Sequence, residues 1–211
     1  MSISLSQKYG LAFHTTTPQL AIALSNFTGD SRSQIWDLGR DLSSCFHQHL
    51  QEILAPQTLQ DISFIAVAKG PGGFTGTRIG VVAARTLGQQ LDIPVYGVST
   101  LSAIAFRILN QITANSLVAV QMNARREQLF VAIYQVASNG IWSSYLEDTI
   151  MTESQWQQTL AALESPYQLV KAPDEIAYSV DSVLSLAYAQ WQEKLYSQWS
   201  EVIPFYGQHP V

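Results

Sequence analysis

The apolar positions in the first half of the chain follow two different spacings. Strand-like apolar runs lie at 9–17, 19–26, 34–36, 62–68 and 94–98. Helical spacing, with apolar residues three and four positions apart, covers 38–54, 75–91 and 101–110. The turn at Thr17-Pro18 makes the first two runs a hairpin, and Pro56 ends the first helix. Ser99 or Thr100 can cap the third helix. The first half therefore reads β-β-β-α-β-α-β-α.

The second half repeats this mixture of strands and helices. Its strand-like runs lie at 116–122, 128–136, 141–151 and 167–171, and its helical stretches at 152–163 and 179–199. Asn139-Gly140 is a hairpin turn signal, and a short apolar tail follows at 202–206. We expect an α/β protein of two lobes, with residues 1–105 in the first and 106–211 in the second.

A glycine-rich turn joins the fourth predicted strand to the second predicted helix. The stretch Lys69–Gly80 reads K-G-P-G-G-F-T-G-T-R-I-G, and the turn itself comprises Gly70, Pro71, Gly72, Gly73, Phe74, Thr75 and Gly76. Such a turn lets backbone approach either a phosphate or another chain closely. The G-K-[ST] ending of a Walker A loop is missing, so the sequence does not predict that phosphate-binding motif.

The second predicted helix carries small residues at every fourth position. Gly76, Gly80, Ala84 and Gly88 form a shallow ridge along one face. Three glycines in a helix cost roughly 1 kcal/mol each relative to alanine, so close packing is expected to compensate. The ridge packs either against the chain's own sheet or against a second protein. Arg78 and Arg85 share one face of the helix. They either pair with groups of a second protein across an interface or remain solvated.

Composition narrows the functional classes. The 211 residues are 47% hydrophobic, which is sufficient for an ordinary core. A formal net charge of −5 disfavours unaided binding to nucleic acid. The first ten residues lack the pattern of a signal peptide and no apolar run approaches the ~20 residues of a membrane span, so we expect a cytoplasmic protein.

The sequence favours structural roles over catalysis or metal binding for its histidines, its cysteine and its aromatic residues. The spacing of His14, His47, His49 and His209 matches no zinc motif, and no metal site is predicted. Cys45 falls on the apolar stripe of its helix, which favours a core position over a nucleophile. The aromatic residues of the second half, Trp156, Tyr188, Trp191, Tyr196 and Trp199, favour core packing, because a platform for stacking RNA needs basic neighbours.

Residues Asp61–Ala105 resemble the TsaB (YeaZ) family. The similarity rests on D-I-S-F-I-A-V-A-K-G-P-G-G-F-T-G-T-R-I-G, then A-A-R-T-L-G, then I-P-V-Y-G-V-S-T-L. The segments at 12–24, 117–134 and 203–206 are similar to the family more loosely. The resemblance implies an actin/Hsp70/sugar-kinase-like (ASKHA) fold, in which two lobes with ribonuclease H-like sheets are flanked by helices.

The same resemblance implies a function in tRNA modification. The family is a noncatalytic scaffold that works with a TsaD-type catalytic paralogue and a TsaE-type ATPase. Together they transfer threonylcarbamoyl to N6 of adenosine 37 of tRNA (t6A). ATP or ADP is then expected only at an interface with the partner subunits, and tRNA only through the complex.

The family pairs, and also self-associates, through its first two helices. Carried over to this sequence, the interface is expected to comprise Leu38, Leu42, Cys45, Phe46 and His49 on the first helix, and Gly76, Arg78, Ile79, Gly80, Val82, Ala83, Ala84, Arg85 and Leu87 on the second.

The sequence departs from the family pattern at several positions. His14 and Asn123 replace acids, Leu42-Ser43 replaces H-S, and P-F-Y-G-Q replaces the tail motif P-L-Y-L-R. Mg²⁺ prefers hard oxygen ligands such as carboxylates, so the loss of two acids argues against autonomous ATP hydrolysis or phosphoryl transfer. In line with the noncatalytic role that the resemblance implies, no catalytic residue is predicted in this chain. Two alternatives stay open, namely an independent ATPase or kinase of this fold, and a self-associating diverged paralogue without the tRNA role.

Overall fold

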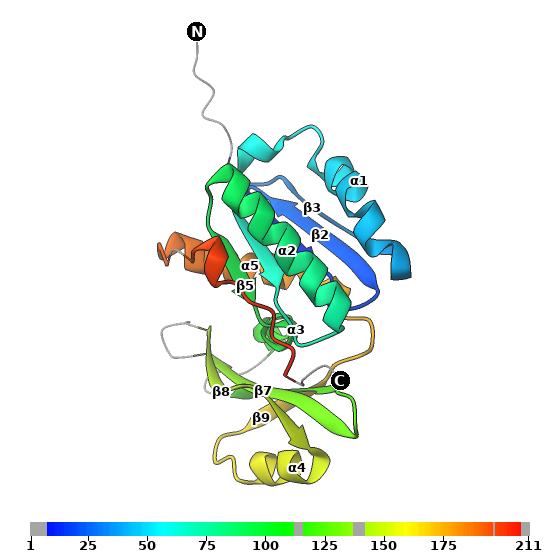
Figure 1. The fold of residues 1–211 in the computed structure, drawn as a ribbon. Coiled ribbons are helices and arrows are strands. Elements are labelled where there is room, and N and C mark those ends of the chain that lie inside the picture. The colour runs from blue at the N-terminus through cyan, green and yellow to red at the C-terminus, as the bar shows by residue number, and fades with distance from the viewer. Residues whose placement is uncertain (1–7, 112–115, 137–141, 196, 208–211) are drawn as a thin grey trace.

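The computed structural model describes residues 8–111, 116–136, 142–195 and 197–207, which form two sheets flanked by helices (Figure 1). The first sheet has the strand order β3-β2-β1-β4-β5 and the second has the order β8-β7-β6-β9. The strands of the first sheet are β1 (Tyr9–His14), β2 (Gln19–Ser25), β3 (Ser31–Asp37), β4 (Ile62–Ala68) and β5 (Val95–Val98). Those of the second sheet are β6 (Leu117–Asn123), β7 (Gln128–Val136), β8 (Trp142–Thr152) and β9 (Tyr167–Lys171).

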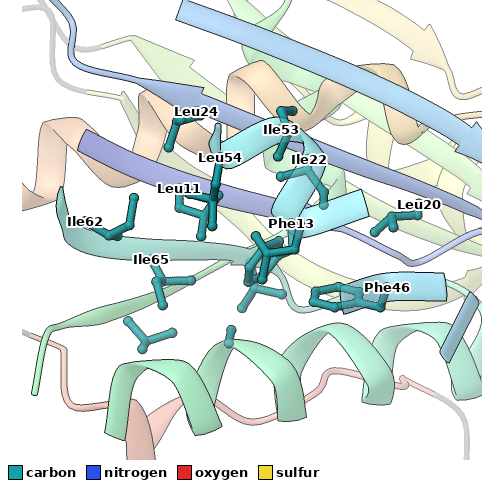
Figure 2. Packing of buried hydrophobic residues seen from close by; sticks show 14 of the residues in the cluster. Leu11, Phe13, Leu20, Ile22, Leu24, Phe46, Ile53, Leu54, Ile62 and Ile65 are labelled. Carbon is teal, nitrogen blue, oxygen red and sulfur yellow. The ribbon is translucent and has the colours of Figure 1, made fainter. Parts of the chain in front are cut away.

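The first sheet is covered on both faces. Its helices are α1 (Leu42–Leu54), α2 (Phe74–Leu91) and α5 (Val180–Gln192). Figure 2 shows the bulky side chains of Leu11, Phe13, Leu20, Ile22 and Leu24 packed with Phe46, Ile53 and Leu54 of α1. The opposite face presents small residues, Ala12, Ala21, Ala23, Ala66 and Ala68, to α5. Because side chains alternate across a strand, these two sets divide cleanly between the α1/α2 face and the α5 face.

The second sheet is covered by two shorter helices. On one face, Trp156 and Leu160 of α4 (Glu153–Ala161) pack against β6 and β7. On the other face lies α3 (Thr100–Phe106), between the two sheets (Figure 1). Thr152 and Gln155 form a capping box that starts α4, so the helix begins where the sequence predicts it.

The predicted order of elements is confirmed, with differences at several boundaries. The strand expected at 34–36 extends over Ser31–Asp37, and a 3-10 turn, Gly39–Asp41, precedes α1. The helix expected at 179–199 ends at Gln192, because Lys194 takes a left-handed conformation (φ 57°) that stops the helical hydrogen bonds. The predicted turn Asn139-Gly140 lies outside the described residues.

The two sheets divide between the expected lobes, but the helices do not. All strands of the first sheet precede residue 106 and all strands of the second sheet follow it. However, α5 packs on the first sheet, and so does the 3-10 turn Trp199–Glu201, which contacts α2. The chain therefore enters the second lobe after α3 and returns to the first lobe at α5.

Candidate functional site

The glycine-rich turn is held against the turn that joins β1 to β2. The Gly73 amide donates to the Thr16 carbonyl at 2.7 Å, and the Thr100 amide donates to the Gly70 carbonyl at 2.9 Å. A β-carbon at Gly72 would overlap the Thr16 side chain. The close backbone approach that the glycines predicted is therefore an approach to this chain's own hairpin.

The small-residue ridge of α2 faces the same hairpin. The Thr15 hydroxyl donates to the Gly76 carbonyl at 2.8 Å, and a β-carbon at either Gly76 or Gly80 would overlap Thr15. Farther along, a β-carbon at Gly88 would overlap Val95 of β5. Of the two interpretations that the sequence left open, the structure shows packing against the chain's own sheet.

This packing divides the expected interface residues into two groups. Leu42, Phe46, Gly80 and Ala84 are buried inside this chain. Arg78 and Val82 are exposed on α2, and the remaining members, Leu38, Cys45, His49, Gly76, Ile79, Ala83, Arg85 and Leu87, are half-buried. Among the apolar residues of the expected interface, Val82 is the most accessible, at 55% exposed.

The two arginines of α2 have separate roles. The Arg78 guanidinium lies 4.9 Å from the centre of the Phe74 ring, on the exposed side of the helix. Arg85 donates to the Val202 carbonyl at 3.5 Å and lies over the Trp199 ring. Arg85 therefore holds the C-terminal segment of its own chain, an arrangement that the sequence did not predict.

That C-terminal segment lies across the glycine-rich turn. The Phe205 amide donates to the Lys69 carbonyl at 2.7 Å, and the Tyr206 ring lies 4.5 Å from the Phe74 ring. Gly70 has a left-handed conformation (φ 105°), and a β-carbon there would overlap the Phe205 carbonyl. The short apolar run at 202–206 was the only sequence signal for this contact.

A cleft of about 980 Å³ separates the lobes beneath this turn. The glycine-rich turn and the β1–β2 turn line one side, and the β6–β7 turn, with Asn123, lines the other. The charged residues among those lining it are Arg40, Arg125, Arg126 and Asp174. This lining is predominantly basic, so it suits an anion rather than a cation.

The two residues that the family resemblance places at acid positions, His14 and Asn123, are neutral and differ in exposure. His14 is fully buried at the end of β1, and burial lowers its pKa from 6.5 to about 3, so the ring is neutral at pH 7. Asn123 is exposed at the end of β6. Neither residue offers the carboxylate oxygen that Mg²⁺ prefers, so this donor set does not fit a Mg²⁺-nucleotide.

Other candidate residues occupy varied environments. Trp156 is fully buried, as expected, whereas Tyr188 and Trp191 are only partly buried. Cys45 is half-buried rather than a core residue. In the part of the chain that the structure describes, no three His, Cys, Asp or Glu side chains gather as a metal site. No helix within these same residues is long and apolar enough to cross a bilayer.

Several known proteins with similar sequences carry one description, that of a tRNA threonylcarbamoyladenosine biosynthesis protein. The chain is 38% identical over 107 residues to the tRNA threonylcarbamoyladenosine biosynthesis protein TsaB of Bacillus subtilis, covering 51% of this chain and 45% of that relative. Over 134 residues it is 34% identical to TsaB of Escherichia coli, covering 63% and 57%. To TsaB of Buchnera aphidicola (from Schizaphis graminum) it is 27% identical over 171 residues, covering 77% and 79%. The first two matches span about half the length of those relatives.

Solved structures and a family model complete the comparison. The fold matches that of YeaZ from Pseudomonas aeruginosa with a TM-score of 0.75 at 22% identity, covering 94% of this chain and 99% of that one. This match confirms the predicted two-lobed fold. Residues 40–197 match the family model described as TsaD, tRNA N6-adenosine threonylcarbamoyltransferase. The chain therefore belongs to the family that this model describes, and its curated relatives confirm the TsaB (YeaZ) type predicted from the sequence.

Proposed function

We propose that this chain is a noncatalytic subunit in the threonylcarbamoylation of N6 of adenosine 37 in tRNA. It pairs with a TsaD-type catalytic paralogue, works with a TsaE-type ATPase in the cytoplasm, and meets tRNA only through that complex. The observation that carries the noncatalytic role is His14. The family resemblance places an acid at this position, but here a fully buried imidazole stands there. Burial lowers its pKa to about 3, so the side chain is uncharged at pH 7 and supplies no negative charge for a bound Mg²⁺ ion.

The contact surface for the paralogue is the outer face of α1 and α2. Val82 is 55% exposed in the middle of α2, and Ile79 and Ala83 beside it are half-buried. Exposed Arg78 borders the same surface. An apolar centre with a polar rim is typical of protein interfaces, so this surface supports pairing. The buried ridge behind it, including Gly80, holds α2 in place rather than contacting the partner.

Co-expression with the TsaD-type paralogue from the same genome tests the pairing. Size-exclusion chromatography with light scattering is expected to show a heterodimer with the unchanged chain. Val82→Glu should abolish it, because a charge would be placed at the centre of the contact. Gln89→Glu is the matched control, since Gln89 is also exposed on α2 but lies in its last turn. A heterodimer that survives Val82→Glu would place the contact elsewhere.

A second candidate function is nucleotide binding by the isolated chain. The basic lining of the interlobe cleft, with Arg40, Arg125 and Arg126, is the observation that favours it. Calorimetry with Mg-ATP separates the candidates: we expect no heat of binding from the isolated chain, with any nucleotide held only at an interface with partner subunits. Saturable binding would favour an independent ATPase or kinase. A homodimer that ignores the paralogue would instead favour a self-associating diverged paralogue.

A further inference from the structure

A second cavity lies at the opposite end of the first sheet from the interlobe cleft. The cleft lies where β1 ends, whereas the second cavity lies where β1 begins and is lined by Lys8, Tyr9 and Gly10. The remaining lining comes from the loop after β2, the start of β4 and the last turns of α5. It measures about 310 Å³, within the range of about 300–1,000 Å³ that is usual for small-molecule sites. We call this cavity the aromatic pocket.

Four rings of the aromatic pocket lie nearly parallel to one another. Phe27 stacks on Tyr188 with 3.6 Å between ring centres and 6° between ring planes. Phe64 lies 5.5 Å from Trp191 at 29° and 6.1 Å from Phe27 at 19°. Tyr188 and Trp191 are 6.0 Å apart at 24°. The rings stack on one another, and the partly buried rings Phe27, Tyr188 and Trp191 border the cavity. This arrangement suits a flat molecule that extends the stack rather than a cage around a round cation.

The ring arrangement is fixed by its surroundings. A β-carbon at Gly10 would overlap the Phe64 ring, so glycine at this position gives the ring its place across β1. Phe27 is held in a left-handed conformation (φ 59°), which is costly for a bulky residue. The loop around it is tied by the Asn26 side-chain oxygen, which accepts from the amides of Thr28 and Asp30 at 2.9 and 3.0 Å. The stacking faces are therefore organised before any ligand arrives.

The charge around the aromatic pocket argues for a small ligand rather than an RNA strand. Lys8 is the single charged side chain among the described residues that line the pocket. Arg32, on β3 just after the loop that lines the pocket, already donates to Asp30 at 3.0 Å and to the Ile53 carbonyl at 2.7 Å. Strand binding requires a basic track for successive phosphates, which these residues do not provide.

We propose that the aromatic pocket binds a planar heteroaromatic ring of nucleobase size, carried by a small molecule such as a nucleoside. The ring stacks on partly buried Trp191 beside Phe27, in a pocket that Ser63 and Thr28 also line. The site lies on the α5 face of the sheet, opposite α1 and α2. It therefore stays open when a partner covers those helices, and the inference does not rest on the proposed function.

Titration of the isotopically labelled full chain with adenosine tests the proposal by NMR. At millimolar adenosine the indole N–H signal of Trp191 and the amides of Phe27 and Ser63 are expected to shift, while ribose alone leaves them unchanged. This map needs no variant. No shift, equal shifts with ribose, or shifts centred on the interlobe cleft would overturn the proposal.

Variants then measure the stacking contribution. Trp191→Leu and Phe27→Leu should each weaken adenosine binding on the order of tenfold, because base stacking on one ring is worth about that factor. Tyr145→Leu is the control, since Tyr145 is an exposed aromatic residue of β8 outside the pocket, and it should bind as the unchanged chain does. Unchanged affinity in both pocket variants would contradict the assignment. Pairing with the paralogue should be indifferent to all three, which separates this test from that of the interface.

Discussion

The Ser99 hydroxyl donates to the Asp148 carboxylate across the junction of the two lobes, with 2.5 Å between the oxygens. Ser99 also caps α3 by accepting from the Ser102 amide at 3.1 Å. Tyr134 donates its hydroxyl to the second oxygen of Asp148 at 2.7 Å. One half-buried carboxylate thus links the end of β5 to strands β7 and β8, and so links the two lobes.

Asp148 should make stability fall as the pH rises. Burial raises the pKa of this carboxyl above 3.8, while the Ser99 and Tyr134 hydroxyls oppose that rise. A group with a raised pKa binds its proton more tightly in the folded state, so its contribution is complete below pH 3.8 and is lost as the pH passes the folded pKa. Urea unfolding measured from below pH 3.8 to above the folded pKa should show the free energy of unfolding decrease as the pH rises. Asp148→Asn should remove this decrease. The same decline in Asp148→Asn would assign the effect to another group.

His14 should have the opposite pH dependence. Its pKa falls from 6.5 to about 3 on folding, so stability is complete above pH 6.5 and decreases as the pH falls toward 3. Neither ring nitrogen has a hydrogen-bond partner among the described residues. His14→Leu should therefore flatten this part of the profile and raise the free energy of unfolding at pH 7 by roughly 1–3 kcal/mol, as expected when an unsatisfied buried polar group is removed. Lower stability at pH 7 would show that the imidazole makes a favourable contact.

Gly80→Ala should destabilise the fold, although alanine is ordinarily the better helix former. The added β-carbon would overlap the Thr15 hydroxyl, and Thr15 is itself fully buried. We expect a loss of roughly 1–3 kcal/mol in urea unfolding, the usual cost of overpacking. Thr86→Ala, at an exposed position of the same helix, is the control and should be neutral or slightly stabilising. A Gly80→Ala chain as stable as the control would mean that the hairpin can move aside.

Gly70→Ala should release the C-terminal segment from the glycine-rich turn. It adds a β-carbon that would overlap the Phe205 carbonyl, in addition to the strain of a left-handed alanine. Hydrogen exchange at the Phe205 amide should become faster, because its bond to the Lys69 carbonyl is lost. Gly29→Ala is the matched control, since Gly29 has a φ of 128° and open space around it. Equal protection of Phe205 in both variants would refute the coupling.

The sequence predicts the elements well because their signals are local. The spacing of apolar residues, the Thr152 capping box and the proline after α1 each act within a few residues, and each predicted element is present. The end of α5 was missed because Lys194 adopts its left-handed conformation in a segment that retains helical apolar spacing. Periodicity indicated an α/β protein, whereas the ASKHA fold came from the glycine motif and its family resemblance.

The candidate site was predictable only in part, because a helix pattern does not say which surface faces which neighbour. The ridge of α2 has the same four-residue spacing whether it meets a second protein or Thr15 of the same chain. Likewise, Tyr188 and Trp191 have core spacing, yet both are only partly buried, and Tyr188 stacks on Phe27, which is far away in sequence. What the α2 ridge faces, and how far Tyr188 and Trp191 are buried, are both decided by contacts between distant parts of the chain.

The return of α5 to the first sheet has a consequence for synthesis on the ribosome. The alanine-lined face of that sheet is covered by residues 180–192, which are made after every strand of both sheets. Until they emerge, a nascent first lobe exposes an apolar surface that its own elements cannot cover. The lobe that is translated first is therefore completed last, and chaperone binding to the nascent chain should persist until α5 has left the exit tunnel.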